Sequence, residues 1–145
     1  MLSEAGAEVS VSGLKKGITE LRKELKIFSE EELTKLVGQL AILTKDLNLS
    51  EDQILAFAKA VAIKNKVSVE EESLSQTAQK LVTPVLTDQS KGAASLGVTL
   101  GDAAIEAKAL DMNLLAAGES ASDLSDQEKK LVKVQIILDS AAKDA

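Results

Sequence analysis

The 145-residue sequence contains no cysteine and no histidine. Without cysteine, disulfide bonds and thiol chemistry are excluded, and nothing indicates an oxidising compartment. The usual protein ligands of zinc, copper and iron are also missing, which leaves only carboxylates for hard cations such as magnesium or calcium. We therefore expect no cofactor and no transition-metal site.

Aromatic residues and arginine are almost as scarce. Two phenylalanines are the only aromatics, so flat platforms for stacking bases, sugars or cofactors can hardly be built. Arg22 is the only arginine, the residue type that best fits phosphates and guanine edges. With 17 basic and 23 acidic residues the net charge is -6, which argues against nucleic acid as a partner. No apolar run approaches the roughly 18 residues of a membrane span, so we expect none in this segment.

The residues that are present indicate helices. Leucine, isoleucine, valine and alanine must fill the core, and such a core suits closely packed helices. Leu14, Ile18, Leu21, Leu25 and Phe28 are spaced alternately by four and three, which predicts a helix over residues 13–28. The class expected is therefore all-α, with five to six short capped helices in a compact or elongated bundle and no sheet.

Later helices are marked by a repeated start signal. A hydroxyl residue that can accept a hydrogen bond from a free helix amide is followed three positions later by an acid or glutamine. The pairs are Ser29 with Glu32, Ser50 with Gln53, Ser68 with Glu71, Thr99 with Asp102, and Ser125 with Glu128. Their separations are irregular, so we infer a chain of short helices and not a solenoid.

Helix ends are marked as well. Asn48 suits the left-handed residue that follows the second helix, and Gly118 is expected to close the helix that Thr99 starts. Pro84 disfavours a helical residue before it, so the fourth helix is expected to end near Val82. Alternatively, Thr83 caps a short helix with Pro84 in its first position.

The chain length suits one domain. We expect a flexible tail over residues 1–12 and a single all-helical domain or segment over residues 13–145. Gly38, inside the second helix, costs about 1 kcal/mol relative to alanine. Close contact with another helix is the expected reason for it.

Charged residues offer two candidate sites. The first helix carries a basic stripe made of Lys15, Lys16, Arg22, Lys23 and Lys26. A solvated face with internal ion pairs is the plain interpretation, and contact with an acidic partner or nucleic acid is the alternative. Asp102 and Glu106 are four residues apart and could hold a cation, but helix-start acids are the favoured interpretation. We find no catalytic constellation and expect no enzyme.

The last helix, over residues 125–145, has apolar residues on more than one face. They are Leu131, Val132, Val134, Ile136, Ile137 and Leu138. One partner surface within the chain is not expected to cover them all, so this set is predicted to be an interaction face and the chain a homo-oligomer through its C-terminal helix. Neither glycine nor proline ends the helix before Ala145, and we expect the natural chain to continue.

Residues 96–145 also show a recognisable order. LGVT opens a small-residue helix containing IEAKALDMNLL, a polar loop follows, and SDQEKKLVKVQIILDSAAKDA closes the stretch. This order resembles the core region of phage tail tape measure proteins, in which an "LGvs" helix start is followed by an LS-x-x-E-K helix with an "ILxxTxDAQ"-like end. Val134 and Gln135 stand where that family often has an aromatic residue. The resemblance covers about the last third of the chain.

The resemblance implies a structural virion protein fragment. A tape measure protein lies in the tail tube, helps to set tail length during assembly and leaves ahead of the DNA. Implied partners are further copies or other tail proteins, and the implied location is the phage tail or the host cytoplasm during assembly. The residues alone leave two alternatives open. One is a helical interaction module whose basic first helix binds a protein or nucleic acid, and the other is a small-molecule carrier.

Overall fold

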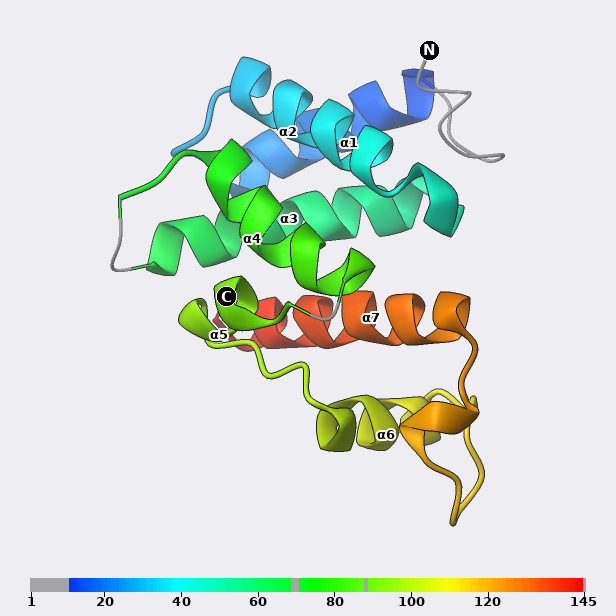
Figure 1. Ribbon diagram of the computed structural model, residues 1–145. Helices are drawn as coiled ribbons and strands as arrows, with labels where there is room; N and C mark the ends of the chain where they lie inside the picture. Colours follow the sequence, from blue (N-terminus) through cyan, green and yellow to red (C-terminus); the bar gives the residue numbers. More distant parts are fainter. Residues whose placement is uncertain (1–10, 69–70, 88, 145) are drawn as a thin grey trace.

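The chain folds into helices throughout the residues that the computed structural model describes, 11–68, 71–87 and 89–144. Within these ranges no strand occurs, which confirms the all-α prediction. In the described ranges, seven α-helices and two short 3-10 helices stack in successive layers, from α1 and α2 through α3 and α4 to α7 and finally α6 (Figure 1). Their bounds are α1 Val11–Glu24, α2 Glu30–Leu43, η2 Lys45–Leu47, α3 Glu51–Val67, α4 Leu74–Leu86, α5 Lys91–Ser95, α6 Asp102–Asp111, η3 Ala121–Asp123 and α7 Asp126–Asp144.

Three of the five predicted helix starts are confirmed. At the start of α2, the amide of Glu32 donates to Ser29 Oγ at 3.1 Å and the amide of Ser29 donates to Glu32 Oε1 at 3.0 Å. Ser50 forms the same reciprocal pair with Gln53 before α3, and Ser125 forms it with Glu128 before α7. Each pair satisfies two backbone amides that have no partner within the helix.

The predicted start at Ser68 is wrong. Ser68 is the residue after the end of α3, and α4 begins at Leu74 with Ser73 as its cap and Gln76 as the third helical residue. The side-chain amide of Asn65 donates to the carbonyl of Glu72 at 2.8 Å. This bond fixes the segment before α4 against the end of α3. The capping box of Ser73 with Gln76 therefore starts the helix, and the pair of Ser68 with Glu71 does not.

The predicted start at Thr99 is also wrong. Helix α6 begins at Asp102 after Gly101, which supplies no side-chain cap. Leu96, Val98 and Leu100 are all buried, while the residues between them are exposed. After the turn at Leu96 and Gly97, burial of both Val98 and Leu100 keeps residues 98–100 out of the helix, because a helix would turn these two side chains to different faces.

The predicted ends are partly right. Asn48 adopts the left-handed conformation, with a φ of 52°, where η2 ends. Gly118 has a φ of 90°, but it lies in the loop after α6 and does not end the helix. The end of α6 is formed around Asn113, whose φ is 61°, and the amide of Leu114 donates back to the carbonyl of Ala109. Asn113 therefore takes the left-handed position after the end of α6 that was predicted for Gly118.

Pro84 does not break its helix. Helix α4 continues through it to Leu86, so both the predicted end near Val82 and the alternative start at Thr83 are wrong. Pro84 cannot donate to the carbonyl of Lys80, but its burial with its neighbours keeps the turn helical. Helix α5 packs beside this turn, where a Cβ on Gly92 would lie 3.0 Å from the Lys80 carbonyl oxygen.

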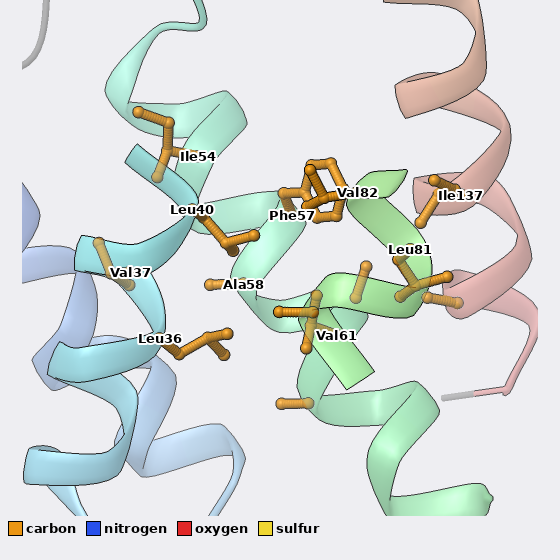
Figure 2. Packing of buried hydrophobic residues seen from close by; sticks show 14 of the residues in the cluster. Leu36, Val37, Leu40, Ile54, Phe57, Ala58, Val61, Leu81, Val82 and Ile137 are labelled. Atoms are coloured by element: carbon orange, nitrogen blue, oxygen red, sulfur yellow. The ribbon is translucent and has the colours of Figure 1, made fainter. Parts of the chain in front are cut away.

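Helix α3 lies at the centre of the large hydrophobic cluster. It packs against α1, α2, α4 and α7, and its buried side chains lie on every face, as expected of a core helix. Figure 2 shows Leu36 and Leu40 of α2 on one side of Val61, with Leu81 of α4 and Ile137 of α7 on the other.

Close helix contact at a glycine occurs in this region, but not at the expected position. The methyl groups of Leu55 on α3 lie over Gly17 of α1, in the space that a Cβ there would occupy. A Cβ on Gly38 would have nothing within 4 Å. The close contact expected at Gly38 is therefore wrong.

Helices α3 and α7 run parallel, in matching register. Near their N-terminal ends, Gln127 Nε2 donates to the carbonyl of Leu47 at 3.1 Å. At their C-terminal ends, Lys64 Nζ and Asp144 Oδ2 are 2.5 Å apart. Both pairs are separated by 80 residues, so the same offset holds along the whole contact (Figure 1).

A buried lysine attaches α7 to α4. Lys133 is 8% exposed, and its ammonium donates to the carbonyls of Pro84 at 2.8 Å and Thr87 at 3.0 Å. These carbonyls lie at the negative end of the α4 dipole, where a cation is favoured. The lysine therefore satisfies backbone groups that the helix itself leaves without partners.

A small second cluster lies on the other side of α7. Its buried members are Ile105, Ala109, Leu115, Ala121, Leu124 and Val132. Ile136 packs against both clusters, so α7 is the element that they share.

The boundary of the predicted tail is corrected, because residues 11 and 12 are already helical. Residues 1–10 lie outside the described residues.

The caps should contribute measurably to stability. We expect Ser29→Ala and Ser50→Ala each to lower the free energy of unfolding by about 1 kcal/mol, since each leaves a helix amide unpaired. Thr99→Ala is the control, because Thr99 is exposed and does not cap α6. Urea denaturation followed by circular dichroism measures the three values. An equal loss of stability at all three positions would contradict the assignment of Ser29 and Ser50 as helix caps.

The two glycines Gly38 and Gly92 should respond to alanine in opposite directions. Gly38→Ala should stabilise the protein by about 0.5–1 kcal/mol, because the site is helical and open. Gly92→Ala should destabilise it by about 1 kcal/mol or more, because the new methyl meets the backbone of α4. Thermal and urea unfolding of the two variants measure the sign of each change in stability. Two changes of the same sign would refute the packing described for α5.

Candidate interaction surfaces

The predicted carboxylate pair has a structural role. Glu106 Oε2 accepts a hydrogen bond from the amide of Ala121 at 2.7 Å, at the start of η3. Asp102 is exposed in the first turn of α6. In the described ranges, no group of three or more acidic, histidine or cysteine side chains is arranged to hold a metal ion. Helix-start interactions account for both acids.

The predicted interaction face on α7 is covered by the chain itself. Val132 and Ile137 are 0% exposed and Val134 is 3% exposed, while Leu131, Ile136 and Leu138 are half-buried and pack against the clusters. Only one partner surface within the chain was expected, but α3 and α4 cover one side of α7 and α6 covers another. These residues therefore do not need a second copy to cover them, and association of copies through this helix stays a prediction.

The basic stripe is exposed, as its plain interpretation requires. Lys15, Lys16, Arg22 and Lys23 lie on α1, on the side away from its buried leucines, and Lys26 follows the end of the helix. Arg22 and Lys23 occupy the last turn, where positive charge complements the helix dipole. Lys23 also pairs with Glu20 at 3.5 Å. The helix dipole and the pair with Glu20 therefore account for these positive charges without a nucleic-acid partner.

A groove of about 1010 Å³ lies beside the C-terminal half of α7. It runs between the end of α3, the linker after α5 and helix α6. Gly97, Ala104 and Ala107 line it with small side chains, and Ile136 adds an apolar patch. Its charged lining residues are Lys64, Lys108, Lys143, Asp111, Asp139 and Asp144. Equal numbers of lysines and aspartates leave the groove without a net formal charge.

Two ion pairs cross this region. Lys64 pairs with Asp144 between α3 and α7. Lys108 Nζ lies 2.5 Å from Asp139 Oδ2 and 3.6 Å from Asp111 Oδ2. Gln135 Nε2 also donates to Asp139, at 2.9 Å. The second network connects α6 to α7.

These contacts shift the pKa values of both partners. The hydrogen bond to Asp139 raises the pKa of Lys108 above its ordinary value, against a lowering by desolvation. Burial acts to raise the pKa of Asp139, but the hydrogen bonds from Lys108 and Gln135 outweigh it and hold this pKa below its ordinary value. Both shifts favour the charged pair.

The sequence alone did not indicate this network. Lys108 and Asp139 belong to different helices, and no local spacing joins them. The sequence also did not indicate the burial of Lys64. This lysine lies near the end of α3, and it is only 3% exposed. Long-range packing alone brings these charges together.

No helix among the described residues is long and apolar enough to cross a membrane. Searches with this chain against protein-family models, curated proteins and solved structures find no match.

The ion pair between α6 and α7 should make stability depend on pH. Asp139→Asn should destabilise the protein at pH 7 by less than about 1 kcal/mol, because the pair is partly exposed. The folded-state pKa of Asp139 is lowered, so this contribution is present above roughly pH 4 and is lost as pH falls through the folded-state pKa.

Urea unfolding at several pH values from 7 to 3 measures the difference between the variant and the wild type. It should shrink toward zero at the acid end. Glu31→Gln, in the exposed pair between Glu31 and Lys35 on α2, serves as the control and should have a smaller effect. A stability difference for Asp139→Asn that stays constant down to pH 3 would contradict the stabilising ion pair assigned to Lys108 and Asp139.

Proposed function

We propose that the chain is a segment of a phage tail tape measure protein, a structural component of the virion that helps to set tail length. The observation that carries the proposal is the order of residues 96–145. The stretch that resembles the family forms α6, a polar loop and α7, and α6 packs along α7. The two helices that the sequence pattern marks are therefore in contact with each other.

The way in which the helices begin supports this role. The boxes at Ser29, Ser50, Ser73 and Ser125 each join residues only three positions apart. Such bonds depend on the local helix and not on the tertiary contacts around it. Starts of this kind would help a segment to stay helical when it is drawn out along a narrow tube.

Partners would have to bind away from the apolar residues of α7, because these are occupied within the chain. Other tail proteins or further copies would therefore contact other surfaces of the folded form. The groove beside α6 and the exposed basic stripe of α1 are the available candidates. During assembly the segment would be in the host cytoplasm, and afterwards in the tail.

Tail length tests the proposal. In the phage that encodes the chain, an in-frame deletion of residues 96–144 should shorten the tail by about 1.5 Å per residue if the segment is helical along the tail axis. A duplication of the same residues should lengthen it by the same amount. Electron microscopy of purified tails measures both, and mass spectrometry checks that the chain is present.

A variant that changes stability but not length provides the control. Ser29→Ala with Ser50→Ala should leave tail length unchanged, since no residue is removed. Tails of normal length in both the deletion and the duplication strains, or purified tails that lack the chain, would rule out the role.

A further inference from the structure

Residues 101–124, here called the α6 flap, form a unit with its own apolar cluster. The flap contains α6, the following loop and η3, and all but one of the buried members of the small cluster lie within it. The remaining member is Val132 of α7. The flap is thus held to the rest of the chain chiefly through one face of one helix (Figure 1).

Both ends of the flap are attached to firmly held residues. On the N-terminal side, Leu96, Val98 and Leu100 are buried in the large cluster. Gly101 then begins the flap, and it has open space around a Cβ position. On the C-terminal side, the flap ends at Leu124, and the Ser125 box starts α7 directly afterwards. The flap therefore lies between two segments that are held by contacts of their own.

Two kinds of contact hold the flap closed. The first is apolar: Ile105 and Ala109 of α6 are buried with Val132 of α7. The second is the ion pair of Lys108 with Asp139, whose side chains are 23% and 39% exposed. The small cluster has far fewer buried members than the large one. Local opening favours such weakly packed units.

We propose that the α6 flap opens as a unit while α1 to α5 and α7 remain folded. Opening breaks the pair between Lys108 and Asp139 and uncovers the side of α7 that carries Val132 and Ile136. In the closed form Val132 is fully covered and Ile136 is covered in part. This opening does not depend on a role in phage tails.

The absence of native cysteine allows a direct test. Val132→Cys places a single thiol under the flap, and Val61→Cys places one in the large cluster on α3. Both valines are 0% exposed. Under conditions where closing is faster than labelling, the rate of reaction with a thiol reagent reports the population of each open form.

The flap thiol should label at least about tenfold faster than the α3 thiol. Ile105→Ala should increase labelling at position 132 by about 30-fold, because it removes a core side chain of the flap, and Lys108→Gln should give a smaller increase there. Leu36→Ala, in the large cluster on α2, should increase labelling at position 61 and leave labelling at position 132 unchanged, because the closed and the flap-open forms lose its contacts equally. Lys35→Gln, in an exposed pair on α2, is the control for Lys108→Gln.

Amide hydrogen exchange separates flap opening from fraying of α7. In Ile105→Ala, exchange should accelerate in α6 while the amides around Val132 in α7 stay slow. Equal labelling at positions 132 and 61, or an equal increase at both in Leu36→Ala, would show a single cooperative unit and overturn the proposal. Fast exchange in α7 together with α6 would overturn it as well.

Discussion

The burial of α7 between two apolar clusters connects the whole structure. On one side, Val134 and Ile137 complete the large cluster around α3, and on the other side Val132 completes the small one beneath α6. Without α7, the flap would have no surface on which to pack and α3 would be left open along its length. The order of the layers follows from this one helix.

Polar contacts fix the position of α7 more narrowly than apolar burial can. Burial is non-directional and would tolerate sliding of one helix along another. The contacts of Gln127 with Leu47 and of Lys64 with Asp144 hold the two ends of the parallel pair in register. Lys133 adds a third point by donating to the end of α4. These three contacts select one arrangement among those that the apolar surfaces allow.

The same arrangement explains why the flap is the separable part. Its linker is anchored by buried side chains, whereas its own cluster is small and its ion pair is partly exposed. Partly exposed ion pairs contribute little to stability, because water and salt screen them.

The sequence by itself determined the helical class and the helix starts at Ser29, Ser50 and Ser125, because a capping box joins residues only three apart. It also indicated the left-handed Asn48. Tertiary structure decided the features that depend on distant contacts. Burial of Val98 and Leu100 overrode the cap at Thr99, and packing beside α5 kept α4 helical through Pro84.

The apolar residues on several faces of α7 were visible in the sequence, but their partners were not. Whether such a helix meets another molecule or two parts of its own chain depends on how segments 80 residues apart align, and no local spacing encodes that alignment. The groove and the pair of Lys108 with Asp139 follow from the same alignment. Short-range hydrogen bonds could therefore be read from the sequence, whereas the surfaces available for binding were set only when the helices packed together.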